Sequence, residues 1–196
     1  MKKTIIVATM LALAACAEAP QTFVAGPLSF EKATSITTVN VHEIRVLNHY
    51  QAPLKRPNVE QEFAVTPAAA VTKWVHQRLR ANPSAPTNSV LEVTINDASV
   101  AEEKLAKTKG FKGLVTDDQD ARYTAKLSVT FKHYPNAGGA SNATGDVIIS
   151  RARTINERAT VNEREAIYHQ MTDALMNDFD REANARLRQY FSPYIR

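Results

Sequence analysis

The stretch Arg122–His133, RYTAKLSVTFKH, alternates residue by residue between apolar and polar side chains. The apolar set is Tyr123, Ala125, Leu127, Val129 and Phe131. The polar set is Arg122, Thr124, Lys126, Ser128, Thr130 and Lys132. Because successive side chains of a β-strand point to opposite faces of the sheet, this period of two predicts a strand with one buried and one wet face. Such a sheet needs an apolar covering layer on one side.

Three further segments have the patterns of strands. The turn Pro135–Asn142, rich in Gly and Asn, leads to a strand over Gly145–Arg153, which predicts a hairpin with the first strand. Upstream, apolar residues at alternate positions of Leu91–Ile95 predict another half-wet strand. Ser35–His49 alternates with one change of phase, which predicts one strand with a bulge. Between the second and third strands in chain order lies a long excursion, Ala98–Asp120.

Two segments have the 3.6-residue period of amphipathic helices. The first begins at Thr66-Pro67, a capping residue followed by proline, and ends at Asn82-Pro83. In the second, Asn162 and Glu165 form a capping box, and the helix ends near Tyr190. The apolar stripe of the first is Val71, Trp74, Val75 and Leu79; that of the second is Ile167, Met171, Leu175, Phe179, Ala183 and Leu187.

These elements predict an α+β fold in the order β-α-β-β-β-α. Helices and half-wet strands need one another's apolar faces, so we expect a single antiparallel sheet of about four strands with both helices packed on one face. The 196 residues, 44% of them hydrophobic and 22% charged, are typical of one globular domain, which we assign to residues 34–196. A single cysteine excludes an internal disulfide, so the core alone must stabilise the domain.

The N-terminus has the three parts of an export signal. Lys2 and Lys3 precede a short apolar run, Ile5–Leu13, and small residues follow immediately before the only cysteine, Cys16. The run is too short for a spanning helix, which needs about 20 apolar residues. Residues 1–15 are therefore predicted to be a signal peptide.

The motif Leu13-Ala14-Ala15-Cys16 resembles the lipobox of bacterial lipoproteins. The resemblance implies cleavage before Cys16, a diacylglycerol thioether with palmitate-like chains on its sulfur, and a lipidated tether over residues 16–33. Ala17, where lipoproteins retained in the inner membrane carry Asp, implies the periplasmic face of the outer membrane, with the inner membrane as the alternative. An ordinary signal peptide with a chance cysteine is the other interpretation of the motif.

Nothing in the sequence assembles an active site. The five histidines lack metal-binding spacing and are expected to be solvated or at edges, the Gly138-Gly139 pair lies in a turn, and the only thiol is committed to lipid. Without Lys2 and Lys3, 22 basic residues face 20 acidic ones, a balance too small to indicate nucleic-acid binding. We expect no catalytic residues, no metal, no cofactor and no nucleic-acid partner.

The excursion contains one segment that mixes basic and apolar residues, over Glu102–Gln119. Its candidate contact residues are Lys104, Lys107, Lys109, Phe111, Lys112 and Leu114. Such a mixture suits an anionic membrane surface or a protein groove. Alternatively, Phe111 and Leu114 fold back onto the sheet and the lysines are simply solvated.

The element order, the lipobox and the long closing helix together resemble small envelope lipoproteins of Gram-negative bacteria. Two groups share these features: auxiliary lipoproteins of lipid-transporting ABC systems and the lipoprotein partner in lipopolysaccharide assembly. Segments Asn58–Trp74 and Lys109–Gln119 also look like parts of uncharacterised lipoproteins of this kind. The resemblance implies a non-catalytic binding or accessory subunit of an envelope complex. The alternatives are a structural or stress-related lipoprotein without a specific partner, and a lipid-binding module with a closed apolar cavity.

Overall fold

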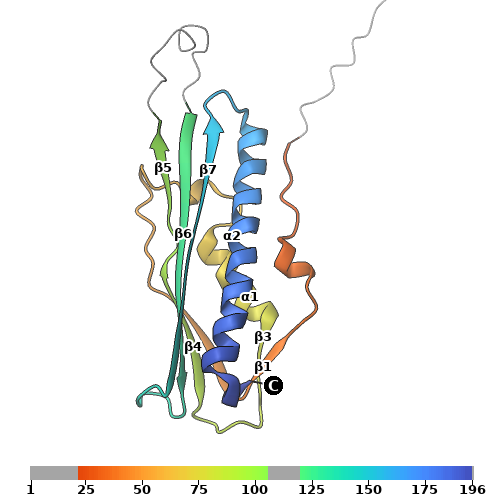
Figure 1. The fold of residues 1–196 in the computed structure, drawn as a ribbon, viewed down its shortest axis with the longest axis vertical. Coiled ribbons are helices and arrows are strands. Elements are labelled where there is room, and N and C mark those ends of the chain that lie inside the picture. Colours follow the sequence, from red (N-terminus) through yellow and green to blue (C-terminus); the bar gives the residue numbers. More distant parts are fainter. Residues whose placement is uncertain (1–21, 106–119, 196) are drawn as a thin grey trace, which may run out of the picture.

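The fold of this chain, seen in a computed structural model, is an elongated sheet with a long helix running beside it (Figure 1). The structure describes residues 22–105 and 120–195. The strands are β1 (Thr37–Val39), β2 (Glu43–Asn48), β3 (Leu79–Ala81), β4 (Val90–Asp97), β5 (Val100–Lys104), β6 (Asp120–Tyr134) and β7 (Ala143–Asn156). The helices are α1 (Pro67–Arg78) and α2 (Val161–Tyr190), with short 3₁₀ turns η1 (Ser29–Lys32), η2 (Glu60–Glu62) and η4 (Ser192–Tyr194).

Strand β6 is the centre of the sheet. Along one edge it pairs antiparallel with β4 and β5, and along the other with β7 over almost its whole length. The predicted alternation is confirmed, because the apolar side chains of β6 are buried while Arg122 and Lys126 are exposed. The predicted hairpin with β7 is also confirmed, with Gly138 in its loop at a φ of 82°, a conformation that favours glycine.

Both helices cover the same face of the sheet, as predicted. Trp74 of α1 meets Phe179 of α2 edge-on, with ring centroids 5.0 Å apart, and both rings lie 6.4 Å from Phe131 of β6. All three side chains are fully buried. Helix α1 begins as predicted, with the Thr66 hydroxyl accepting a hydrogen bond from the Ala69 N–H at 3.2 Å. The core therefore forms where two helices and one sheet face meet.

The sheet is not the single antiparallel sheet of four strands that the sequence predicted. It is a mixed sheet of five strands, in which β2 and β4 run parallel, and β1 and β3 form a separate parallel pair. Helix α1 lies between β2 and β4 in the chain. The connection returns the chain to the end of the sheet where β2 began, so β4 runs in the same direction as β2 and the two pair in parallel. Four strands were predicted because β3 and β5 are too short to show a period.

Three predicted boundaries were also wrong. The bulged strand Ser35–His49 is two strands, β1 and β2, that belong to different sheets, and the change of phase marks the break between them. Helix α1 ends at Arg78 and not at Asn82. The cap of α2 is Thr160 with Glu163, not Asn162 with Glu165, because a capping box places the acidic residue three positions after the cap and the helix begins at Val161.

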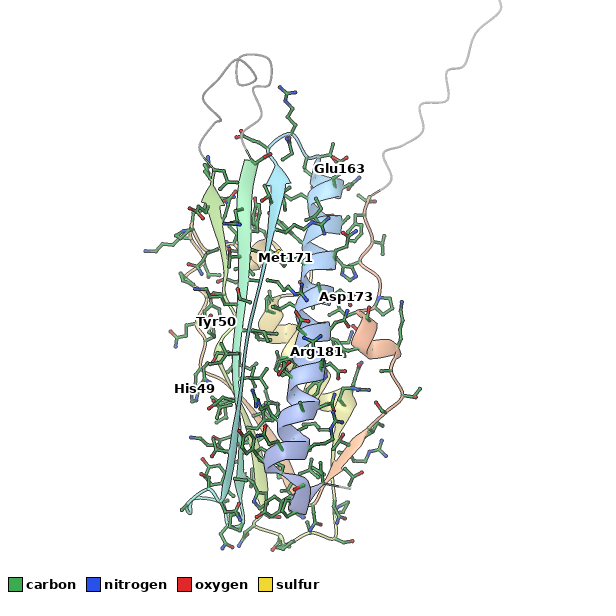
Figure 2. All side chains as sticks on the ribbon, viewed as in Figure 1. His49, Tyr50, Glu163, Met171, Asp173 and Arg181 are labelled. Atoms are coloured by element: carbon green, nitrogen blue, oxygen red, sulfur yellow. The ribbon has the colours of Figure 1, made fainter. Side chains whose placement is uncertain are left out.

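The N-terminal segment 22–33, part of the predicted tether, packs along the outer side of α2 (Figures 1 and 2). The Ser29 N–H and hydroxyl both donate to the Asp173 carboxylate, at 2.5 and 2.7 Å, and the Phe23 N–H donates to Asn162 Oδ1 at 3.2 Å. Leu28 and Phe30 are 1% and 2% exposed. We call residues 22–33 the strap.

Neither helix of the described ranges is both long and apolar enough to cross a bilayer.

Adjacent residues of β6 provide a direct test of the one-sided core. Leu127→Ala removes a fully buried side chain and should lower the free energy of unfolding by about 2–5 kcal/mol. Lys126→Ala, one residue away on the wet face, should change it by no more than about 0.5 kcal/mol. Chemical denaturation measures both. Similar losses in the two variants would contradict the assignment of faces.

Candidate functional site

The predicted site residues fall mostly outside the described ranges. These are Leu13, Ala14, Ala15 and Cys16 of the lipobox, and Lys107, Lys109, Phe111, Lys112 and Leu114 of the basic-apolar segment. Lys104 is described, exposed at the end of β5. The first part of the predicted excursion is not a loop, because Val100–Lys104 forms β5 and pairs with β6.

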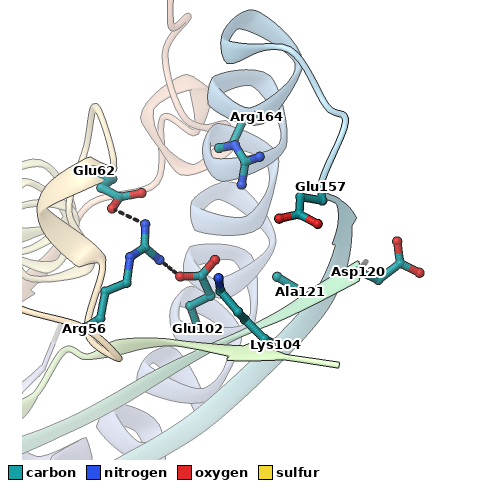
Figure 3. A pocket seen from close by; sticks show the side chains of 8 residues that line it. All are labelled: Arg56, Glu62, Glu102, Lys104, Asp120, Ala121, Glu157 and Arg164. Carbon is teal, nitrogen blue, oxygen red and sulfur yellow. Dashed lines mark hydrogen bonds and ion pairs between the residues drawn. The ribbon is translucent and has the colours of Figure 1, made fainter. Parts of the chain in front are cut away.

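Lys104 lines a charged cavity of about 300 Å³ at the end of the sheet where β5 stops and β6 begins. The lining comes from five parts of the chain: the 56–62 region, strand β5, strand β6, the turn after β7, and the first turn of α2 (Figure 3). Its members are Arg56, Glu62, Glu102, Lys104, Asp120, Ala121, Glu157 and Arg164. The cavity is thus the meeting point of the strand and helix ends at one pole of the molecule.

Arg56 joins two carboxylates of this cavity (Figure 3). Its guanidinium pairs with Glu62 at 3.0 Å and with Glu102 through its other terminal nitrogen. The Glu102 side chain is only 9% exposed, whereas that of Arg56 is 56% exposed. A carboxylate so far removed from water needs a compensating charge, and Arg56 supplies it.

Tyr123 continues the network into the core. Its hydroxyl donates to Glu102 Oε1 at 2.8 Å and accepts from the Arg164 guanidinium at 2.8 Å. Burial raises the pKa of Tyr123 to about 12, so the phenol stays protonated and keeps donating at neutral pH. Tyr168 packs edge-on against Tyr123 and stacks on Phe63, so the polar network borders a cluster of aromatic rings.

Three of the charged side chains, Arg56, Glu62 and Glu102, form ion pairs with one another inside the cavity. The ion pairs of Arg56 and the hydrogen bond from Arg164 to Tyr123 connect the 56–62 region and α2 to the sheet. The Lys104 ammonium, at the rim of the cavity, has no ion-pair partner among the described residues. Within the ranges the structure describes, no three His, Cys, Asp or Glu side chains gather closely enough to hold a metal ion.

Sequence reasoning found only Lys104 of this cavity. Arg56, Glu62 and Arg164 belong to elements far apart in the chain, and none shows a period or motif that would bring them together. One histidine also differs from expectation: His133 is buried, stacked on Tyr194 with centroids 3.9 Å apart and in contact with Asn142. It occupies the next inward position of β6 after Phe131, so the alternation itself could have predicted its burial.

No family model and no curated protein matches the chain. Among solved structures, it is similar to a minor lipoprotein from Acinetobacter baumannii, with 12% identity over 76% of this chain and 94% of that one, and a TM-score of 0.38. It is also similar to the rare lipoprotein B from Shewanella oneidensis, with 10% identity over 75% of this chain and 98% of that one, and a TM-score of 0.34. Both neighbours are lipoproteins by their descriptions, but at these identities and TM-scores the likeness carries no argument about function.

Two ion pairs of different burial test the role of Arg56. Arg56→Ala removes the cation beside the buried Glu102 carboxylate and should lower the free energy of unfolding by about 1–3 kcal/mol. Arg45→Ala breaks the ion pair with Glu43, 2.8 Å long, in which both side chains are about half exposed, and should leave stability essentially unchanged. Chemical denaturation compares the two. Equal changes in the free energy of unfolding would show that Arg56 contributes no more to stability than an exposed surface charge.

Proposed function

We propose that this chain is a lipid-anchored envelope lipoprotein that acts as a non-catalytic binding or accessory subunit at the periplasmic face of the outer membrane. The observation that carries the proposal is the lipobox Leu13-Ala14-Ala15-Cys16, which contains the only cysteine of the chain. The resemblance to lipoproteins of lipid-transport and lipopolysaccharide-assembly systems supports the accessory role.

The strap supports an anchored role for the N-terminus. A lipid on Cys16 holds the domain only through the residues that follow it, and from Phe23 onward these contact α2 at Asn162 and Asp173. Several acyl chains on one cysteine anchor firmly, since each buried methylene contributes about 0.8 kcal/mol. A pull on the anchor is therefore transmitted to the longest helix.

Core packing favours the accessory role over a lipid-binding module. Such a module needs an apolar cavity between helices and sheet. In this chain Trp74, Phe131 and Phe179 fill that place with interlocking, fully buried rings. The charged lining of the cavity at the pole does not suit an acyl chain either.

The anchor is tested by Cys16→Ser in the full chain. Wild-type protein should incorporate labelled palmitate, sediment with membranes and shrink in mass by residues 1–15. The serine variant should take no label and leave the membrane fraction, because a hydroxyl cannot form the thioether. Palmitate incorporation by both proteins, or by neither, would contradict the anchor at Cys16.

The accessory role is tested by crosslinking in intact envelopes, followed by affinity purification. Wild type should recover a defined envelope protein, and substitution of Lys109, Phe111 and Lys112 by Ala should reduce that recovery. Lys126→Ala, on the wet sheet face, is the matched control and should leave recovery unchanged. Recovery of the same abundant porins from all three proteins would contradict a specific partner.

A further inference from the structure

The strap leaves the domain at one pole only. Residue numbers rise along the strap as they rise along α2, since Phe23 contacts Asn162 and Ser29 contacts Asp173. The described chain therefore begins, at residue 22, at the end of the molecule where α2 begins (Figure 1). We call this end the tether pole.

The remaining length of chain limits where the bilayer can lie. Seven residues connect Cys16 to Phe23, and even fully extended they span about 25 Å. Helix α2 has 30 residues and is about 45 Å long. The β6–β7 hairpin loop lies at its far end, because Gly145 packs beside Tyr190 and Phe191. A lipid on Cys16 cannot reach a bilayer placed at the hairpin end while Phe23 stays docked.

The tether pole also carries a surface suited to a membrane. Val24 and Val161, on either side of the Phe23–Asn162 hydrogen bond, are 84% and 72% exposed. A concavity of about 530 Å³ lies between the end of β7 and the first turns of α2, with Arg153 and Arg158 on its wall and apolar Ile155 and Ile167 beside them. Arginine binds phosphate strongly, and apolar side chains enter the interfacial layer of a bilayer.

One acidic residue, Glu163, shares that concavity. Its carboxylate is already used, since it accepts hydrogen bonds from the Thr160 N–H and hydroxyl, both at 2.8 Å. The hydrogen bonds from the Thr160 N–H and hydroxyl lower the pKa of Glu163. Arg153 and Arg158 bring two positive charges to the concavity, and Arg153 also donates to Gln170 Oε1 at 2.8 Å.

We infer that the tether pole is the membrane-facing surface of the domain, with Val24, Val161 and the Arg153–Arg158 concavity against the phospholipid headgroups that hold the anchor. The inference rests on the proposed lipidation of Cys16. It sets the β6–β7 hairpin on the side away from that bilayer, and it places the charged cavity with Lys104 close to the membrane.

Probes at the two ends of α2 test this orientation in the full, lipidated chain. Because Cys16 is blocked by its thioether, an introduced cysteine is the only free thiol. Val161→Cys reports the tether pole, and Ala140→Cys, exposed in the hairpin loop, is the matched control. Each is labelled with a fluorophore and reconstituted into phosphatidylethanolamine–phosphatidylglycerol vesicles that contain a headgroup nitroxide lipid.

Quenching at position 161 should exceed that at position 140 several-fold. An Asn162→Ala/Asp173→Ala variant, which removes the acceptors that hold Phe23 and Ser29, should reduce this difference, and thermal denaturation checks that it remains folded. Equal quenching at both positions, or stronger quenching at 140, in a chain whose mass shows the acyl groups would overturn the orientation alone. A mass without acyl groups would overturn the proposed anchor and the orientation with it.

Discussion

A fifteen-residue strand whose apolar side chains all point one way can be buried only from that side, and this constraint on β6 organises the molecule. Both helices lie on the apolar face, and α2 runs along β7 for most of its length. The side of α2 that faces away from the sheet is covered in part by the strap, through Leu28, Phe30 and the hydrogen bonds to Asp173. Sheet, helix and strap form successive layers on one side, and the opposite face of β6 and β7 carries exposed or half-buried side chains.

The same layering gives the two ends of the molecule different properties. At one end the strap leaves beside Asn162, and Arg56, Glu102 and Tyr123 form a charge-paired network under the ends of the strands. At the other end lies the β6–β7 hairpin loop. The proposed lipid on Cys16 would thereby be connected to one particular pole of the domain. An accessory subunit held in this way would present the same surfaces to its membrane and to any partner throughout.

The elements that could be predicted are those long enough to repeat a pattern: β4, β6, β7 and both helices. The missed features depend on contacts between distant segments. Strand β5 is short and contains Glu102, whose carboxylate is satisfied by Arg56 and the Tyr123 hydroxyl, so its polar sequence concealed a strand. Parallel pairing of β2 with β4 follows from the path of the chain around α1, which no local period records. The strap was predicted to be a tether because Pro and Gly interrupt it, yet Phe30 finds a buried place against elements over a hundred residues away.

In this proposal the strap is docked on α2, and the anchor therefore determines how the domain is oriented relative to the membrane. Amide hydrogen exchange, read by mass spectrometry on peptides covering residues 22–33, tests it most directly. These amides should exchange slowly in the wild type, and Asp173→Ala should accelerate exchange at Leu28–Ala33 while β6 stays protected. Exchange of the whole strap at the rate of a free chain in the wild type would contradict it.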